Sequence, residues 1–322
     1  MEKGVKKIAI LGRGAWGGAI SDITSSNGCE TVLYSNNGEN VKKINEKYAA
    51  NRRVWATDNL KSAVENGNYI FVILPSSAVN EVLISLRGLS AVYDKKFVIF
   101  TKGIDEVSGK FFSELTEDFF PNSKIAALSG PNFAVEVAEK KLTVTTLATE
   151  DVRFFNELEP LLNCEYFRLK YFDDPIAAQL CGLVKNVLAI LCGVSEGLEL
   201  GRNTYSALIT RGIGEIEAIC LKLGRDSRVI GTPAGAGDIF LTCGSLKSRN
   251  MTFGFRIGGG ERAEDVEKSM NTTVEGLSNA VNLKNIAERI GVNSIANAVL
   301  DIVKNNYQRE KLIEIIMNNI FE

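Results

Sequence analysis

The sequence predicts an α/β protein with two domains: an N-terminal dinucleotide-binding (Rossmann-like) domain and an all-α C-terminal domain. Apolar strands recur up to residue 171, and a glycine-rich turn follows the first of them directly. From residue 174 onward the pattern is helical. A length of 322 residues also favours two domains. We therefore place a dinucleotide-binding domain at residues 1–174 and a helical substrate-binding domain at residues 175–322.

The composition excludes several classes of function. The net charge is −2 and no long basic stripe occurs, so we expect neither nucleic acid nor a membrane surface as a partner. The chain contains no histidine, which removes the commonest general base and the commonest metal ligand. We therefore expect no metal site and no Ser-His or Cys-His pair. Any proton transfer must use Lys, Asp, Glu, Tyr or Cys.

The cysteines and the N-terminal segment predict a cytoplasmic protein. The six cysteines form no CxxC pair and mostly lie in apolar surroundings, as reduced thiols do. The apolar part of the segment Met1–Gly12 is too short for a signal peptide.

The first strand, turn and helix have the spacing of a dinucleotide-binding unit. A strand at Lys7–Leu11 leads into the turn Gly12–Gly17, a helix extends to about Asn27, and a second strand covers Glu30–Tyr34. In such a unit the first glycine permits a tight turn, the second lets a pyrophosphate approach the backbone, and the third lets helix and strand pack closely. An ordinary glycine-rich turn is the alternative.

The residues after the second strand bear on the choice of cofactor. An acid at this position bonds the ribose 2′-hydroxyl and repels a 2′-phosphate. Here the chain reads Tyr34-Ser35-Asn36-Asn37, so NADP is permitted, although no arginine follows the strand at once. The nearby cations fit a solvated helix face better than a phosphate clamp; they are Lys42, Lys43 and Arg52. Both NADP and NAD stay open.

Three further apolar strands end in polar or glycine-rich loops. The strands are 69–74, 97–100 and 125–128, and two more are predicted at 142–149 and 167–171 around a helix at 152–162. Ligands bind outside the carboxyl ends of the strands in open α/β sheets. We therefore expect Lys102 and the loop Gly130–Ala134 at one rim, with a solvated loop lysine as the alternative for Lys102.

The segment Pro175–Ser195 is apolar except for one charge, that of Lys185. It is long enough to cross a membrane, but Gln179, Lys185 and Asn186 would then lie near the bilayer centre. We interpret it instead as a core helix that presents one ammonium group. Further helices are predicted at 206–223, 263–269, 275–290, 295–305 and 309–319.

A glycine-rich segment, Gly231–Asp238, interrupts these helices. We expect a loop that presents Asp238, since no strand precedes it as a second dinucleotide turn would require. The alternative role for Asp238 is that of a helix cap.

These motifs together resemble the bacterial NAD(P)-dependent glycerol-3-phosphate dehydrogenase family over nearly the whole chain. No single motif is decisive, but the ordered set is specific. The set comprises GxGxWG (Gly12–Gly17), LPS (Leu74–Ser76), TKG (Thr101–Gly103), SGPNFA (Ser129–Ala134), VKN (Val184–Asn186), TRG (Thr210–Gly212), GAGD (Gly235–Asp238), LTC (Leu241–Cys243), SRN (Ser248–Asn250) and VEG (Val274–Gly276).

The resemblance implies reduction of dihydroxyacetone phosphate to sn-glycerol 3-phosphate for phospholipid synthesis. It makes Lys185 the catalytic acid/base, with Lys102 and Asp238 as further catalytic residues. It places cofactor binding on Gly12, Gly14, Ala15, Trp16, Gly17, Asn36, Ser76, Lys102, Ala134, Arg249, Thr273 and Glu275. It places substrate binding on Lys102, Gly130, Asn132, Lys185, Asp238, Thr242, Ser248, Arg249 and Asn250. Many relatives carry Thr in place of Asn132, and His or Arg in place of Asn36.

The residue types suit this chemistry. A protonated lysine beside a ketone oxygen stabilises the charge that hydride transfer builds there and supplies the proton. Burial and Lys102 would lower the pKa of Lys185 below its free value of about 10.4, while Asp238 would oppose this. Arg249 offers a fork of donors that can bind a phosphate bidentately.

Two other functions stay open at this point. One is another two-domain NAD(P)-dependent reductase, of the 3-hydroxyacid or ketopantoate type, and the other is a non-catalytic nicotinamide-binding scaffold. The expected partner is a small phosphorylated substrate, and the apolar C-terminal helices are compatible with a homodimer.

Overall fold

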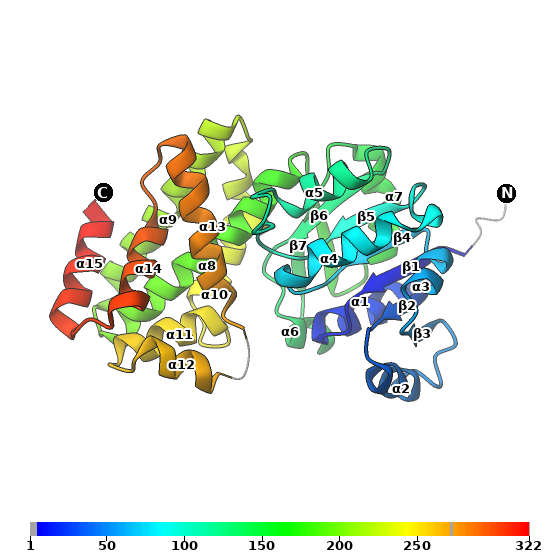
Figure 1. The fold of residues 1–322 in the computed structure, drawn as a ribbon, viewed down its shortest axis with the longest axis horizontal. Coiled ribbons are helices and arrows are strands. Elements are labelled where there is room, and N and C mark those ends of the chain that lie inside the picture. Colours follow the sequence, from blue (N-terminus) through cyan, green and yellow to red (C-terminus); the bar gives the residue numbers. More distant parts are fainter. Residues whose placement is uncertain (1–4, 271–272, 322) are drawn as a thin grey trace. The chain divides into compact units, whose positions relative to one another are not determined.

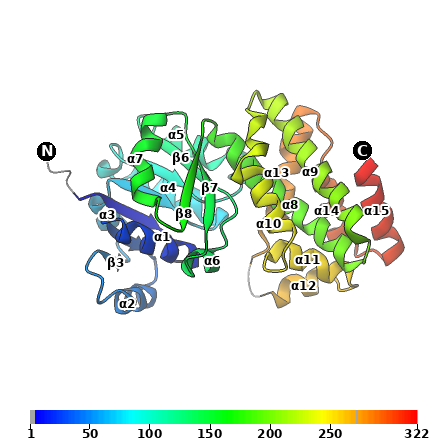
Figure 2. The same ribbon diagram turned by 180° about the vertical axis from the view of Figure 1, so that it is seen from behind.

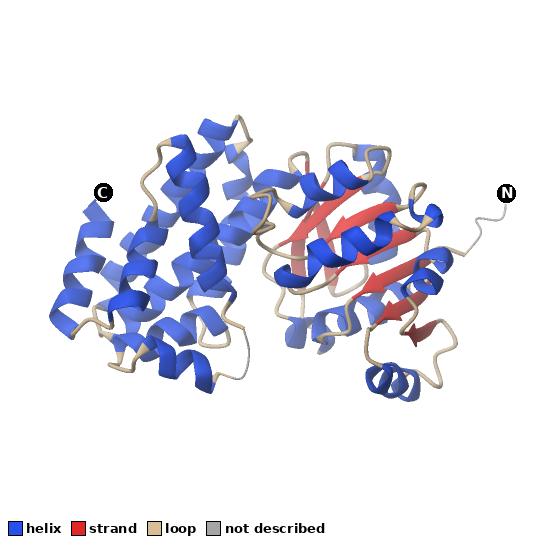
Figure 3. Ribbon diagram, viewed as in Figure 1, coloured by secondary structure: helices blue, strands red, loops and turns tan. Residues whose placement is uncertain are grey.

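The computed structural model describes residues 5–270 and 273–321. Contacts divide it into two compact units, Met1–Ile176 (unit 1) and Ala177–Glu322 (unit 2). Unit 1 holds all the strands, and unit 2 is helical (Figure 3). The division falls in the first turn of helix α8 (Pro175–Gly197), just after the limit expected from the sequence. Residues 1–4, part of the segment that argued against a signal peptide, lie outside the described residues.

Unit 1 is built on one eight-stranded sheet with the order β3-β2-β1-β4-β5-β6-β7-β8. Neighbours from β3 to β6 pair in parallel, β7 runs antiparallel to β6, and β8 is parallel to β7. The strands are β1 (Lys7–Leu11), β2 (Glu30–Tyr34), β3 (Val54–Thr57), β4 (Tyr69–Val72), β5 (Lys96–Ile99), β6 (Ile125–Ser129), β7 (Thr143–Ala148) and β8 (Phe167–Phe172).

Helices cover both faces of this sheet. Helices α4 and α5 cross its front in Figure 1, and α1 and α7 lie in front in Figure 2. The helices of unit 1 are α1 (Ala15–Ser26), α2 (Gly38–Lys47), α3 (Leu60–Asn66), α4 (Ser76–Arg87), α5 (Phe112–Phe119), α6 (Ala134–Ala138) and α7 (Val152–Leu162).

The central strand β4 shows why its sequence is apolar throughout. Its side chains alternate between two cores: Tyr69 and Phe71 pack with α1 and α7, and Ile70 and Val72 pack with α4 and α5. All are at most 1% exposed. A strand covered on both faces has no polar face to show, so it appears in the sequence as a continuous apolar run.

The edge strand β3 lies outside the sequence prediction. Only Val54 and Ala56 of its four residues are buried, and it pairs with β2 alone. Three of the four residues are apolar, but a strand this short is too brief to show an alternating pattern in the sequence.

Unit 2 is a bundle of helices, and its described residues contain no strand. The helices after α8 are α9 (Gly201–Leu223), α10 (Asp238–Cys243), α11 (Arg249–Gly258), α12 (Ala263–Ser269), α13 (Glu275–Ile290), α14 (Ile295–Asn305) and α15 (Arg309–Phe321). By length and composition α8 could cross a membrane, but its most apolar stretch of 18 residues is wholly buried inside the protein. This is the environment of a core helix in a soluble protein.

Helices α8 and α11 cross at backbone contact distance. A Cβ atom on Gly254 of α11 would lie 2.0 Å from the carbonyl oxygen of Ile190 in α8. A Cβ atom on Gly193 of α8 would lie 2.2 Å from the carbonyl oxygen of Met251. Only glycine fits at these positions, so the crossing fixes α11 closely against α8.

Candidate active site

Lys185 is the centre of a buried polar cluster in unit 2. Its Nζ donates to Asp238 Oδ1 at 2.8 Å and to Thr242 Oγ1 at 2.6 Å. The hydroxyl of Thr242 in turn reaches Asp238 Oδ1 at 3.2 Å. Lys185 is 5% and Asp238 1% exposed. An ammonium group can stay charged at such depth because a carboxylate pairs with it and hydrogen bonds complete its shell.

The position of Asp238 and Thr242 follows from the start of α10. The two residues are four apart on one helix, so their side chains share a face. The preceding segment is not the loop expected from the sequence: Ser227–Gly231 and Pro233–Gly237 form short helical turns. Gly235 breaks the second turn with φ −85° and ψ −108°, and a Cβ atom there would lie 2.5 Å from the Val229 carbonyl oxygen.

Asp238 is not the N-cap of its helix. Gly237 occupies that position, and the carboxylate of Asp238 binds Lys185 instead. Asp238 therefore does not cap α10, and its carboxylate accepts a hydrogen bond from the Lys185 ammonium.

The buried thiol of Cys243 contacts the backbone of Lys185, and a second buried thiol, Cys192, forms a hydrogen bond with Cys243. Cys243 Sγ donates to the Lys185 carbonyl oxygen at 3.8 Å. The pKa of Cys192 is raised well above the usual thiol value, mainly by burial and secondly by the hydrogen bond with Cys243. Buried thiols of this kind are inert.

Three segments that are distant in sequence meet at the start of α11. Ser248 is its N-cap and accepts a hydrogen bond from the Met251 amide. Asn250 is buried, and its Oδ1 accepts from the Gly276 amide at 2.9 Å. A Cβ atom on Gly276 would lie 2.7 Å from the Asn186 carbonyl oxygen. The VKN, SRN and VEG motifs are thus packed together.

The other predicted residues of unit 2 flank this junction. Arg249 is the first residue of α11 and is exposed. Thr273 is exposed, and Glu275 is half-buried at the start of α13.

The glycine turn of unit 1 has the geometry that a dinucleotide requires. Gly12 has φ +130°, and a Cβ atom there would lie 2.0 Å from the Ile73 carbonyl oxygen. A Cβ atom on Gly17 would lie 2.3 Å from the Gly12 carbonyl oxygen. On Gly14 it would meet none of the described atoms within 4 Å. The first and third glycines allow close backbone packing, and the space beside the second glycine is open. A pyrophosphate can therefore approach the backbone of this turn.

Three predicted cofactor residues lie around this turn. Ala15 begins α1, directly after the turn. The indole of Trp16 packs against Phe100 and Phe167, with ring centroids 6.2 and 6.1 Å away, so at least part of it serves the core. Asn36 is exposed just after β2.

The loops after β5 and β6 carry the remaining predicted residues of unit 1. Lys102 is half-buried, and Thr101 Oγ1 beside it donates to the Leu74 carbonyl oxygen at 2.9 Å. Gly130 has φ +157°, and a Cβ atom there would lie 2.6 Å from Thr145 Oγ1. Asn132 Nδ2 donates to the same oxygen at 3.3 Å. Ser76 and Ala134 begin α4 and α6.

The sequence analysis did not single out Asp105, which holds the Lys102 loop in place. Asp105 is 5% exposed. Its Oδ1 accepts from Asn80 Nδ2 at 2.9 Å, and its Oδ2 accepts from the amide and hydroxyl of Ser108 at 2.8 and 2.6 Å. The carboxylate thus ties the loop to α4.

Family models match both halves of the chain. A model described as the N-terminus of NAD-dependent glycerol-3-phosphate dehydrogenase matches residues 7–155, and the model of its C-terminus matches residues 174–314. The chain belongs to the NAD-dependent glycerol-3-phosphate dehydrogenase family.

Individual members of the glycerol-3-phosphate dehydrogenase family match over almost their full length. The chain is 31% identical to a glycerol-3-phosphate dehydrogenase of Leptospira biflexa, covering 97% of each chain, and 35% identical to one of Parvibaculum lavamentivorans, covering 92% of each. Both names specify NAD(P)+. The crystal structure of a glycerol-3-phosphate dehydrogenase from Coxiella burnetii has a TM-score of 0.89 at 29% identity, with 97% of this chain and 99% of that one covered.

A more distant likeness concerns the fold alone. The ternary structure of D-mandelate dehydrogenase with NADH and anilino(oxo)acetate has a TM-score of 0.60 at 15% identity, with 95% of this chain and 99% of that one covered.

Membership of the glycerol-3-phosphate dehydrogenase family favours the first function that the sequence suggested over the hydroxyacid and ketopantoate alternatives.

Proposed function

We propose that this protein reduces dihydroxyacetone phosphate to sn-glycerol 3-phosphate with NADH or NADPH, and that it also catalyses the reverse reaction. The observation that carries the proposal is the buried Lys185 ammonium, bonded to Asp238 and Thr242 in a chain of this family. The glycerol 3-phosphate formed is a head-group precursor of phospholipids, and the cytoplasm is the proposed site of the reaction.

The bound dihydronicotinamide supplies a hydride to the ketone carbon. Lys185 stabilises the negative charge that grows on the ketone oxygen and donates a proton to it. Asp238 orients the ammonium and balances its charge before the reaction. Thr242 accepts from the same ammonium and so limits the directions in which its protons point.

The binding residues fall in both units. In unit 1 the glycine turn holds the pyrophosphate, and the loops that carry Lys102, Gly130 and Asn132 contact substrate and nicotinamide. In unit 2 Ser248, Arg249 and Asn250 bind the substrate phosphate. The remaining cofactor contacts are those named above at Ala15, Trp16, Asn36, Ser76, Ala134, Thr273 and Glu275. Residues 1–174 and 175–322 are accordingly the nucleotide and substrate domains.

An absorbance assay at the reduced nicotinamide band tests the function. We expect dihydroxyacetone phosphate to oxidise at least one reduced cofactor. A pyruvate-like or ketopantoate-like carboxylate at the same concentration serves as the comparison. Binding of a cofactor without oxidation would favour the scaffold function instead. Light scattering tests the homodimer.

Arg249→Ala is expected to raise KM for dihydroxyacetone phosphate by about 30-fold, with a smaller effect on kcat. The guanidinium is exposed at the first residue of α11, and a charge-assisted hydrogen bond is worth about 2 kcal/mol. Steady-state kinetics with varied substrate give the result, and Arg289→Ala, an exposed arginine on α13, is the control. If only the KM for cofactor rose, Arg249 would belong to the nucleotide site.

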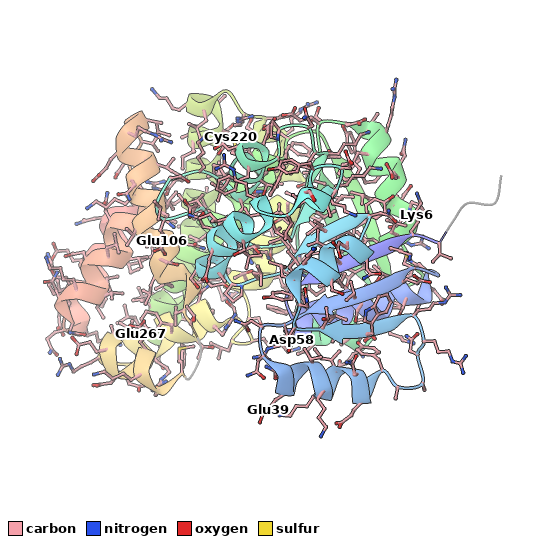
Figure 4. All side chains as sticks on the ribbon, turned by 45° about the vertical axis from the view of Figure 1, so that its right-hand side comes forward. Lys6, Glu39, Asp58, Glu106, Cys220 and Glu267 are labelled. Atoms are coloured by element: carbon pink, nitrogen blue, oxygen red, sulfur yellow. The ribbon has the colours of Figure 1, made fainter. Side chains whose placement is uncertain are left out.

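Asp105→Ala is expected to lower kcat/KM by about tenfold, because the loop that carries Lys102 loses its hydrogen bond to Asn80 of α4 and its two internal hydrogen bonds to Ser108. The loss of a buried acceptor also costs about 2 kcal/mol of stability. Kinetics and thermal unfolding are measured together, with Asp105→Asn as the conservative variant. Glu106→Ala is the matched control, since Glu106 is exposed (Figure 4). A loss of stability with unchanged kinetics would make Asp105 purely structural.

A further inference from the structure

Arg13 lies inside the glycine turn, between Gly12 and Gly14, and its guanidinium is held against helix α2. With the amide of Asn40 turned so that its oxygen faces the guanidinium, that oxygen accepts from Arg13 Nε at 2.9 Å and from Nη2 at 3.2 Å. Asn40 is in the first turn of α2, the helix that follows β2. No arginine follows β2 at once in the sequence, but Arg13 reaches the start of α2 from the glycine turn.

The surroundings of this guanidinium match the position of an adenosine ribose. In a dinucleotide-binding unit the ribose 2′ position lies at the end of the second strand. Here that end carries only neutral side chains: Ser35, Asn36 and Asn37. The hydroxyl oxygen of Ser35 accepts a hydrogen bond from the backbone amide of Asn37 at 3.3 Å, and Asn37 is the N-cap of α2. No carboxylate occupies the position from which an acid would bind a 2′-hydroxyl.

Two carboxylates lie farther along the chain. Glu39 and Asp58 are both near the start of α2 (Figure 4). A Cβ atom on Gly38 would lie 3.6 Å from Asp58 Oδ2. Both side chains are exposed, so water and salt screen their repulsion of an anion. A guanidinium that contacts a phosphate directly outweighs charges screened in this way.

We propose that Arg13 binds the 2′-phosphate of NADPH and makes this protein prefer NADP(H) to NAD(H). The inference rests on the proposed function, and it adds which of the two nicotinamide cofactors the nucleotide site prefers. Asn40 uses one edge of the guanidinium, through Nε and Nη2, and leaves Nη1 and the remaining Nη2 hydrogen to the phosphate. Asn40 is the positioning residue, because it holds the long side chain in the orientation that meets the ribose.

Adenosine fragments test this without any catalysis. Calorimetric titration with 2′,5′-ADP and with 5′-ADP compares ligands that differ only in the 2′-phosphate. We expect the wild-type protein to bind 2′,5′-ADP at least about tenfold more tightly, as a charge-assisted contact of about 1.5–3 kcal/mol implies. Arg13→Gln removes this ratio and leaves the affinity for 5′-ADP unchanged. Arg52→Gln, an exposed arginine beyond α2, keeps the ratio.

Two further variants sharpen the test. Asn40→Ala lowers the ratio by less than Arg13→Gln does, since the guanidinium stays but loses its support. Asn36→Asp places an acid after β2 and reverses the preference towards 5′-ADP. Equal or weaker binding of 2′,5′-ADP by the wild type, or a ratio that survives in Arg13→Gln, overturns the proposal. Failure of the proposed function is a separate result: neither cofactor is then oxidised by dihydroxyacetone phosphate, while the fragment titrations still report on Arg13.

Discussion

Lys185→Met is expected to lower kcat by at least about 10³-fold while cofactor binding is retained. The variant keeps the apolar stem of the side chain and removes both the proton donor and the charge beside the ketone oxygen. The residues of the glycine turn belong to unit 1, so the nucleotide still binds. Turnover is followed by nicotinamide absorbance, and binding is followed by calorimetry on the same preparation.

Loss of Lys185 also leaves the Asp238 carboxylate buried without its partner, at 1% exposure. Breaking a buried ion pair costs about 3–5 kcal/mol of stability, so the single variant could lose activity through unfolding alone. The double variant Lys185→Met with Asp238→Asn removes both charges. We expect it to recover stability relative to Lys185→Met and to remain inactive.

This pair of variants separates chemistry from stability. Inactivity in a double variant that unfolds like the wild type assigns the loss to the proton donor. Near-normal turnover in either variant would remove Lys185 from the mechanism, and the buried cluster would then be a structural ion pair.

The sequence predicts those parts of the fold whose burial is strong and periodic. Strands β1 and β2 and helices α7, α13 and α14 have the predicted limits, because their apolar patterns end there. The antiparallel pairing of β7 with β6 was outside the prediction, since burial on both faces makes the strands apolar without recording their direction. Strand β3 was missed for a different reason: its four residues, VWAT, are too few to show a period.

The site divides in the same way. Lys185 stands out in the sequence as a lone charge in an apolar helix, and the structure brings the Asp238 carboxylate and the Thr242 hydroxyl to its ammonium. Asp105 and Arg13 carry no such signal. An aspartate in a polar loop and an arginine in a glycine turn look like solvated charges, and only the fold shows that Asn80 and Asn40 hold them.

Gly254→Ala is expected to destabilise unit 2 by about 3 kcal/mol. The added Cβ would lie 2.0 Å from the Ile190 carbonyl oxygen and 3.0 Å from the Val194 amide nitrogen. Both atoms are backbone of α8, so no side chain can turn aside and the two helices must separate. Urea unfolding followed by far-ultraviolet circular dichroism measures the change, since the helices dominate that signal.

Gly214→Ala is the matched control for helix propensity. Gly214 is exposed on α9, and a Cβ atom there would meet none of the described atoms within 4 Å. The same substitution is therefore expected to stabilise the protein by about 0.5–1 kcal/mol, because alanine loses less backbone entropy than glycine in a helix. If the free energy of unfolding falls in Gly254→Ala and rises in Gly214→Ala, the loss at Gly254 comes from its contact with α8 and not from helix propensity.

The crossing of α8 and α11 also links stability to function. Lys185 lies on α8, and Arg249 and Asn250 begin α11. The distance between the proposed proton donor and the proposed phosphate-binding residues therefore depends on how closely these helices pack. At temperatures where Gly254→Ala remains folded, its KM for dihydroxyacetone phosphate is expected to rise about tenfold, since a shift of the order of 1 Å disturbs substrate alignment. Unchanged kinetics in the folded variant would show that α11 can move without affecting the site, and would place the phosphate-binding residues elsewhere.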